Sequence, residues 1–249
     1  MEYLSNSRLN YFKKLLRGKF AKDERKVVVE GKKICLELIE NNSDLIEYAL
    51  INDKYQNEFK DIEIPAFLVK DFFSPQISLS NNGFDMALVI NYFKLELEAP
   101  KTLGKGIYVG LENIQDPFNL GSIIRTATAF GINGIFLIGE SVHQFNNKVI
   151  ASSSGAVFKI PTYKIKSVEE FKSKYPKIKI YGTSSKQGTD FRKLDIKNGL
   201  ILFGNEGYGI EKTSEKFVDE FIIVPIKNID SLNLSVSCGI IISRVTMDI

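Results

Sequence analysis

Three segments in the second half of the chain carry polar residues whose types and spacing could do chemistry. In the first, Asp116–Gly131 (DPFNLGSIIRTATAFG), Asn119 and Arg125 are six residues apart, roughly 1.7 helical turns, and so lie near one side of a helix. We predict Asn119 as the helix N-cap, and Gly121 allows another group to approach the first turn closely. Arg125 would then be a fixed cation on a packed helix, although a capped helix with an exposed arginine explains the same pattern.

The second segment is Leu202–Ile210 (LFGNEGYGI), in which three glycines surround Asn205 and Glu206 directly after an apolar run. Gly204 and Gly207 permit unusual backbone angles and leave room for a flat ligand. The spacing matches neither the dinucleotide fingerprint nor the Walker loop, so a phosphate cradle is not indicated. An ordinary glycine-rich turn is the alternative interpretation.

The third segment is Ile223–Gly239 (IVPIKNIDSLNLSVSCG), in which Pro225 ends a predicted strand. Ser231, Asn233 and Ser235 follow, and they place hydroxyl and amide groups at the start of an apolar helix. Such groups could hold a polar ligand. The alternative is that Ser231 caps the helix, and capping is compatible with a functional role.

The elements that must position these segments alternate regularly after Gly106. The predicted strands have apolar cores and are Ile107–Leu111, Gly134–Ile138, Ile178–Tyr181, Leu200–Phe203 and Phe221–Val224. The predicted helices are Asn119–Phe130, Lys148–Ser154, Val168–Tyr175, Ile210–Phe217 and Leu232–Val245. This alternation predicts an α/β domain with a parallel sheet covered on both faces. Ligands bind beyond the carboxyl ends of such strands, where the three segments fall.

A domain boundary is expected in Phe93–Gly106, which mixes charge, proline and glycine without a clear period. It would separate a smaller α/β domain, residues 1–98, from a larger one, residues 105–249. In the smaller domain we predict helices at 11–16 and 32–39, and strands at 26–29, 66–69 and 86–90.

Positive charge is concentrated at the N-terminus. The whole chain carries a formal net charge of only +3, but residues 1–33 hold ten Lys or Arg against four Asp or Glu. A local basic arm is typical of contact with a phosphate backbone, and Arg8, Arg17 and Arg25 are the first candidates for that contact. A solvated helix face explains the charge equally well.

The cysteine and histidine content excludes several classes of site. Cys35 and Cys238 stand in apolar surroundings and are predicted to be buried thiols in a reducing compartment. His143 is the single histidine, which argues against a metal site and a Ser-His-Asp triad. No apolar stretch reaches membrane-spanning length and no signal core is present, so we expect a cytoplasmic protein with no membrane and no metal partner.

Taken together, the three segments read N-x-G-x-x-x-R, F-G-N-E-G-x-G and P-x-x-x-x-x-S-L-N-x-S. Their order and spacing resemble the signature motifs of the SpoU/TrmH family of RNA ribose methyltransferases, in the SPOUT superfamily. The resemblance covers about residues 105–249. In addition, Asp23–Lys33 (DERKVVVEGKK) is similar to part of the substrate-binding domain found in ribosomal-RNA members.

The resemblance implies a SPOUT domain whose C-terminal segment passes through a loop as a trefoil knot. It also implies a homodimer, in which Arg125 of one subunit faces the cofactor of the other and Asn119 supports the loop of the first motif. The cofactor would be S-adenosylmethionine, which carries no phosphate and needs an apolar slot with backbone groups at its edge. The residues expected to line or neighbour its pocket are Thr183, Ser184, Gly204, Asn205, Gly207, Val224, Ile226 and Leu232.

The implied reaction is methylation of a ribose 2′-hydroxyl, a group that RNA has and DNA lacks. The resemblance assigns catalysis to Asn119, Arg125, Glu206, Ser231 and Asn233. Because a guanidinium stays protonated, we expect Arg125 to orient a substrate phosphate and to stabilise the developing alkoxide. Glu206, Ser231 and Asn233 are left as candidates for handling the proton or holding the ribose.

One position departs from the family pattern. Ala151, in Asn147–Ala156 (NKVIASSSGA), stands where the family often has an arginine, so either another cation contacts RNA or the loop differs in substrate choice. Ribosomal RNA is the expected substrate because of the additional N-terminal domain, and resistance methyltransferases share this architecture. Transfer RNA is the alternative substrate, and a catalytically silent RNA-binding or assembly protein is the alternative function.

Overall fold

A computed structural model describes residues 1–79 and 81–247. The chain divides into two compact units, Met1–Leu95 and Glu96–Ile249, and each is described by itself.

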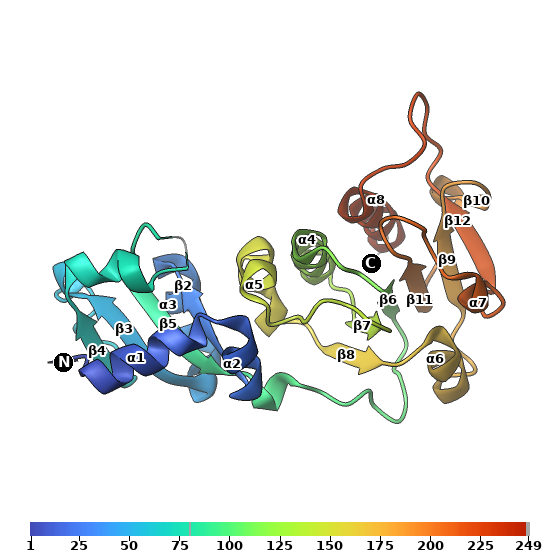
Figure 1. The fold of residues 1–249 in the computed structure, drawn as a ribbon. Helices are drawn as coiled ribbons and strands as arrows, with labels where there is room; N and C mark the ends of the chain where they lie inside the picture. The colour runs from blue at the N-terminus through green and yellow to red at the C-terminus, as the bar shows by residue number, and fades with distance from the viewer. Residues whose placement is uncertain (80, 248–249) are drawn as a thin grey trace. The chain divides into compact units, whose positions relative to one another are not determined.

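The first unit is built on a five-stranded mixed sheet of order β1-β4-β3-β5-β2. Its strands are β1 (Glu2–Tyr3), β2 (Lys26–Glu30), β3 (Ile46–Asn52), β4 (Ala66–Val69) and β5 (Met86–Asn91). Its helices are α1 (Asn6–Leu15), α2 (Gly18–Asp23) and α3 (Lys32–Asn42), as Figure 1 shows. The predicted α/β character of this unit is confirmed, although β1, β3 and α2 were not predicted.

Helix α1 begins five residues before its predicted start because Ser5 caps it. The Ser5 hydroxyl accepts the backbone N–H of Arg8 at 3.4 Å. Phe12 and Leu15 of this helix are buried against Val28 and Leu50 of the sheet, so apolar packing fixes α1 on one face. That packing leaves the basic side chains of α1 on its outer surface.

The second unit contains a seven-stranded sheet of order β10-β12-β9-β11-β6-β7-β8, in which every pairing is parallel. Its strands are β6 (Ile107–Glu112), β7 (Gly134–Ile138), β8 (Thr162–Ile165), β9 (Ile180–Ser184), β10 (Thr189–Asp190), β11 (Gly199–Phe203) and β12 (Glu220–Ile223). Its helices are α4 (Pro117–Ala129), α5 (Asn147–Ser153), α6 (Val168–Lys174), α7 (Lys212–Glu215) and α8 (Leu234–Thr246).

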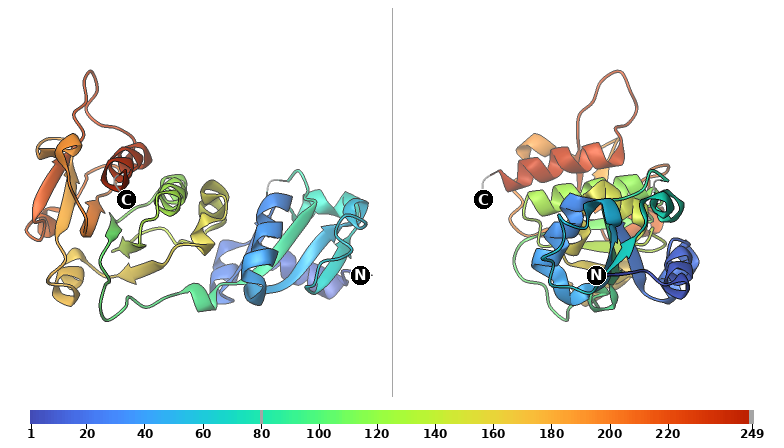
Figure 2. Two further views of the ribbon diagram at one scale, coloured as in Figure 1. Left: turned by 180° about the vertical axis from the view of Figure 1, so that it is seen from behind. Right: turned by 90° about the vertical axis from the view of Figure 1, so that its left-hand side faces the viewer.

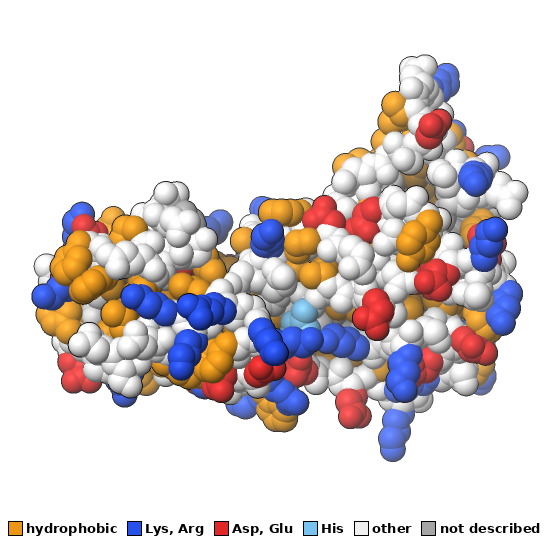
Figure 3. Space-filling model, viewed as in Figure 1, with side chains coloured by type: hydrophobic (Ala, Val, Ile, Leu, Met, Phe, Trp, Pro, Cys, Tyr) orange, Lys and Arg blue, Asp and Glu red, His pale blue; other side chains and the backbone are white. Residues whose placement is uncertain are grey.

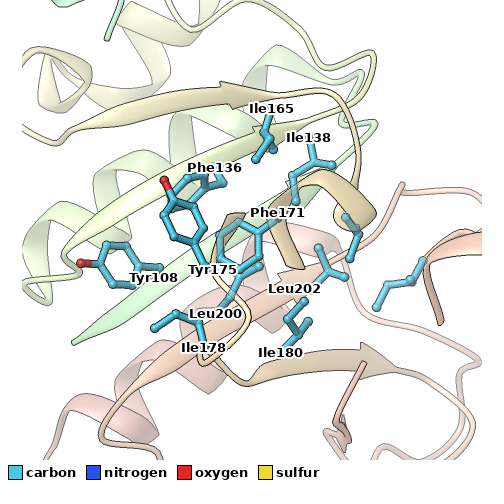
Figure 4. Close-up of a cluster of buried hydrophobic side chains, with 12 residues drawn as sticks. Tyr108, Phe136, Ile138, Ile165, Phe171, Tyr175, Ile178, Ile180, Leu200 and Leu202 are labelled. Atoms are coloured by element: carbon cyan, nitrogen blue, oxygen red, sulfur yellow. The ribbon is translucent and has the colours of Figure 1, made fainter. Parts of the chain in front are cut away.

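Helices cover both faces of this sheet, as predicted. Helices α4, α5 and α8 lie on one face, and α6 lies on the other (Figures 1 and 2). Phe171 of α6 and Tyr175 at its C-terminal end pack edge-to-face against Phe136 of β7, and they are tilted against each other, over the apolar side chains of the central strands (Figure 4). Burial of this cluster anchors the strands whose carboxyl ends lead into the three polar segments.

The strand register brings those carboxyl ends together. Phe203 at the end of β11 pairs with Leu111 of β6, and Ile223 at the end of β12 pairs with Ser184 of β9. The loops that begin at 113, 204 and 224 therefore leave the same edge of the sheet. A parallel sheet places its ligand sites at this edge.

The structure differs from the prediction most clearly at α7. A helix was predicted over Ile210–Phe217, but α7 spans only Lys212–Glu215, because Glu211 has an extended backbone and the N–H groups of Phe217 and Val218 bond only three residues back, to Ser214 and Glu215. Strands β8 and β10 were not predicted. The trefoil knot stays a prediction. None of the described helices is long and apolar enough to cross a membrane.

Candidate active site

Helix α4 begins at an Asp-Pro pair. Asp116 is its N-cap, and its carboxylate accepts the N–H of Phe118 at 2.8 Å, while Pro117 occupies the first helical position. The prediction that Asn119 caps this helix was therefore wrong. Proline has no N–H to satisfy and a φ already suited to the first turn, so the helix starts two residues earlier. Asn119 lies within that first turn and is 7% exposed.

The side-chain amide of Asn119 connects the three polar segments. Its Nδ2 donates to Oε1 of Glu206 at 3.3 Å, and its Oδ1 accepts Nδ2 of Asn233 at 3.0 Å. The Glu206 carboxylate also accepts the backbone N–H groups of Gln115 at 3.5 Å and Asp116 at 3.3 Å. The structure thus brings together three of the predicted catalytic residues through hydrogen bonds made by both ends of one amide.

Asn233 is the N-cap of α8. Its Oδ1 accepts the N–H of Ser235 at 2.9 Å and the hydroxyl of Ser235 at 2.7 Å. The alternative interpretation, in which Ser231 caps this helix, does not hold, because the short Asn233 amide stands next to the first turn and reaches its N–H groups directly. Ser231 lies two residues earlier and is exposed.

The glycine-rich loop after β11 closes on itself. The N–H and C=O groups of Asn205 and Gly209 bond reciprocally at 2.9 Å, and a Cβ on Gly204 would stand 2.0 Å from the carbonyl carbon of Gly209. Gly204 is therefore required by the closure of the loop. The Asn205 side chain bonds within the fold, accepting the N–H of Gly207 at 2.8 Å and donating to the carbonyl of Asn113 at 2.7 Å.

The remaining residues predicted for the cofactor pocket lie on β9 or after β12. The Thr183 hydroxyl donates to the carbonyl of Leu202 at 3.2 Å, and the Ser184 hydroxyl accepts the N–H of Lys186 at 3.1 Å. Both hydroxyls thus bond to the chain's own backbone. The other three, Val224, Ile226 and Leu232, are half-buried.

Gly121 and Arg125 lie on faces of α4 that neighbour α5. A Cβ on Gly121 would stand 1.9 Å from the Ser152 hydroxyl, so the group that approaches this turn closely is α5. Arg125 is exposed, and its guanidinium donates to the hydroxyl of Ser154 at 3.1 Å. No hydrogen bond between described residues links Arg125 to Asn119 within one chain.

A buried carboxylate that the sequence motifs did not indicate lies beside this loop. Glu112 at the end of β6 is 3% exposed, and it accepts the N–H of Glu211 at 2.9 Å and the hydroxyl of Ser214 at 2.5 Å. Burial raises the pKa of the Glu112 carboxyl above its ordinary value. An acidic residue ending an apolar strand is the one signal that could have indicated it.

The three arginines predicted to contact RNA differ in their surroundings. Arg8 lies 4.1 Å above the Phe67 ring and 3.9 Å from the Glu2 carboxylate, and Arg25 lies 4.6 Å above the Phe93 ring. Arg17 is exposed and has no ion pair with a described residue. Lys and Arg side chains gather on the surface over α1 (Figure 3).

No group of three or more His, Cys, Asp or Glu that could hold a metal ion occurs in residues 1–79 and 81–247. His143 lies 3.3 Å from the Glu96 carboxylate.

The SpoU rRNA Methylase family model matches residues 106–243, a range that contains all three polar segments. The chain belongs to this family. Membership in this family confirms the resemblance that was used to select the candidate site residues.

Curated relatives include a protein of Mycoplasma genitalium named as an uncharacterized tRNA/rRNA methyltransferase. It is 33% identical over 54% of this chain and 58% of its own length. This match therefore spans less than two thirds of the relative. A second relative, the 23S rRNA (guanosine(2553)-2′-O)-methyltransferase of Bacillus subtilis, is 24% identical over 97% of both chains.

Solved structures of SpoU-type proteins share the whole fold. An S-adenosylmethionine-bound rRNA methyltransferase from Sinorhizobium meliloti aligns with a TM-score of 0.83 at 22% identity, over 100% of this chain and 97% of its own. The SpoU methyltransferase AviRb from Streptomyces viridochromogenes, in complex with the same cofactor, aligns with a TM-score of 0.80 at 19% identity, over 98% of both chains. Both alignments also cover the first unit.

Proposed function

We propose that the chain is an S-adenosylmethionine-dependent methyltransferase that modifies the ribose 2′-hydroxyl of RNA, with ribosomal RNA as substrate. The observation that carries the proposal is the Asn119 amide, which holds the loops after β6, β11 and β12 together at the carboxyl edge of a parallel sheet. Such an edge is where ligands bind in sheets of this kind. The family to which the chain belongs is one of rRNA methylases, and its model spans all three loops.

The chemistry of the groups at this edge fits the cofactor. Val224, Ile226 and Leu232 provide half-buried apolar surface after β12, whose end lies at the same edge of the sheet as the closed Gly204–Gly209 loop. An adenine ring needs such an apolar slot. The cofactor has no phosphate, in keeping with the missing phosphate cradle. We assign the pocket to these residues together with the backbone at Thr183, Ser184, Asn205 and Gly207. When bound, S-adenosylmethionine supplies an electrophilic methyl group.

Arg125 is assigned to the RNA. It is exposed, permanently charged and held by Ser154, so it is suited to bind a substrate phosphate and to stabilise the negative charge that develops on the ribose oxygen. A guanidinium that keeps its proton is unsuited to act as the base. Because Arg125 stands apart from the Asn119 contacts within one chain, its role requires that a second subunit bring it to the cofactor.

The three residues joined by hydrogen bonds are assigned different roles. Glu206 accepts the Asn119 amide and two backbone N–H groups, so it positions the turn that begins α4. Asn233 uses its oxygen as a helix cap and its nitrogen on Asn119. The exposed hydroxyl of Ser231 is therefore the group that we assign to the ribose.

A homodimer is supported by the surface of α4 and α8, which pack against each other. Phe118 is 56% exposed and Val236 is 50% exposed, each in the first turn of its helix. Large apolar side chains exposed this close to a site are typical of an interface. A dimer formed on this surface would bring the α4 of one subunit near the active site of the other.

Ribosomal RNA is favoured over transfer RNA because the Bacillus subtilis relative, which is named as a 23S rRNA enzyme, aligns along both units. We assign the first unit to RNA binding, with Arg17 and its lysine neighbours as phosphate contacts. Such a substrate would place the protein in the cytoplasm.

Two measurements on the purified full chain test the proposal. Calorimetry should detect S-adenosylmethionine binding, and incubation with ribosomal RNA should yield 2′-O-methylnucleosides on digestion. Arg125→Ala should bind the cofactor and yield none. A folded dimer that binds no cofactor would instead support the silent RNA-binding function, and methyl groups on bases would contradict ribose methylation.

A further inference from the structure

We infer that Glu112 is a positioning residue that sets the affinity for S-adenosylmethionine by fastening the glycine-rich loop to the end of β6. We call the contacts of Glu112 with Glu211 and Ser214 the Glu112 clasp. The inference rests on the proposed function, because it concerns the same cofactor.

The clasp is buried and made of short contacts. Glu112 is 3% exposed and Ser214 is 6% exposed. One carboxylate oxygen accepts the N–H of Glu211 at 2.9 Å and the other accepts the Ser214 hydroxyl at 2.5 Å. Buried donors that lose their acceptor incur a desolvation penalty, so the fold strongly favours the clasped arrangement.

A second set of contacts strengthens the attachment at the next residue. Asn113 has a left-handed backbone, with φ of 55°, and its amide donates to the Glu211 carboxylate at 2.6 Å. Its carbonyl accepts the Asn205 amide at 2.7 Å, and its Oδ1 accepts the N–H of Glu140 at 2.8 Å. The end of β6 therefore binds the glycine-rich loop at Asn205, near its start, and at Glu211, after its last glycine.

The clasp fixes the position of the glycine-rich loop, which we assign to the cofactor pocket. The loop between its two attachments contains Gly207, assigned to the pocket, and Glu206, which holds Asn119. Loss of the clasp would remove the buried attachment at Glu211 and leave there only the contact of its carboxylate with the Asn113 amide. A pocket wall that is mobile before binding must be ordered by the ligand, and this ordering lowers affinity.

Hydrogen bonding by Glu112, and not its charge, is the property that the clasp requires. Glutamine at 112 keeps an acceptor for the Glu211 N–H and offers a donor to the Ser214 oxygen, so Glu112→Gln should preserve the clasp. Leucine has a similar size and neither group. Glu112→Leu should therefore loosen the loop at Glu211 while β6 stays packed.

The test compares these variants in the full chain by calorimetry with S-adenosylmethionine and by amide hydrogen exchange without it. Glu112→Leu should raise Kd about tenfold and abolish protection of the Glu211 N–H, because a buried donor loses its acceptor. Glu112→Gln should stay within about twofold of wild type in Kd and keep that protection. Ile165→Ala, a buried change on β8, is the control that lowers thermal stability without loosening the loop.

Wild-type affinity in folded Glu112→Leu would overturn the inference, and so would a Kd for Glu112→Gln as high as that of Glu112→Leu. If Glu112→Leu does not fold, Ser214→Ala removes one contact of the clasp, and the expected increase in Kd is about threefold. An unchanged Kd for Ser214→Ala would then overturn the inference. Failure of the wild-type chain to bind the cofactor would instead contradict the proposed function, and the hydrogen-exchange comparison would still report on the clasp.

Discussion

Asn119 donates its side-chain amide to the carboxylate of Glu206 at 3.3 Å, although 87 residues separate the two positions. The same amide accepts a hydrogen bond from Asn233, 114 residues away, at 3.0 Å. One nearly buried side chain thus sets the relative position of three loops that are distant in sequence. The proposed active site depends on these contacts of Asn119.

Replacing Asn119 should impair methyl transfer more than it impairs folding. Asn119→Asp removes the donor and places two carboxylates in contact, so we expect single-turnover methylation of ribosomal RNA to fall by on the order of 10². Asn41→Ala, an exposed amide on α3, is the matched control and should be unaffected. Methylation by Asn119→Asp at the wild-type rate would contradict the positioning role.

Arg125→Lys tests whether the shape of the cation matters as well as its charge. Lysine keeps the charge and loses the planar fork, so turnover should drop by roughly tenfold or more while cofactor affinity is unchanged. Steady-state kinetics and calorimetry on the same protein separate the two effects. Arg192→Lys, an exposed arginine paired with Asp190, is the control. Turnover close to the wild-type rate in Arg125→Lys would contradict bidentate recognition of the substrate by Arg125.

RNA affinity should depend on the basic surface of α1 and α2. Charge reversal of Arg17 and Lys22, which are exposed, should weaken binding of ribosomal RNA fragments and reduce the slope of log K against log salt by about 1.5. Lys60→Glu changes an exposed lysine elsewhere in the same unit and serves as control. If the salt slope of the double variant equals that of the wild type, the basic surface of α1 and α2 does not contact RNA.

Both cysteines should resist thiol reagents in the folded protein. Burial raises the pKa of the Cys35 and Cys238 thiols, so at pH 8 they stay protonated as well as inaccessible. A spectrophotometric thiol assay should detect no reaction at pH 8 until denaturant is added, when two thiols should react. Rapid labelling of either cysteine without denaturant would contradict the described packing around α3 or α8.

The sequence was sufficient to predict the alternating elements, because strands such as Gly134–Ile138 are apolar throughout and are separated by loops with clear turn residues. It was also sufficient to select Asn119, Glu206 and Asn233, since their motifs match a family pattern. Their mutual contacts were not predictable, because they depend on how distant strands pair.

Errors at helix starts had a local origin. At α4, the interpretation favoured Asn119 over the Asp116-Pro117 pair, although proline at the first helical position is a strong start signal. At α8, the alternative interpretation took Ser231 as the cap instead of Asn233, which lies two residues later, because both are good capping types. Apart from its place at the end of an apolar strand, nothing near Glu112 in the sequence indicates its burial, because both of its partners lie about 100 residues away.

The most direct test of the central claim is mass-spectrometric mapping of ribose methylation in ribosomal RNA from cells with and without the gene. We predict that a 2′-O-methylated nucleotide present in the parent is lost in the deletion strain. Wild-type protein should restore it, and Arg125→Ala should not. Identical ribose methylation in both strains would contradict the assignment of this chain as a ribosomal-RNA methyltransferase.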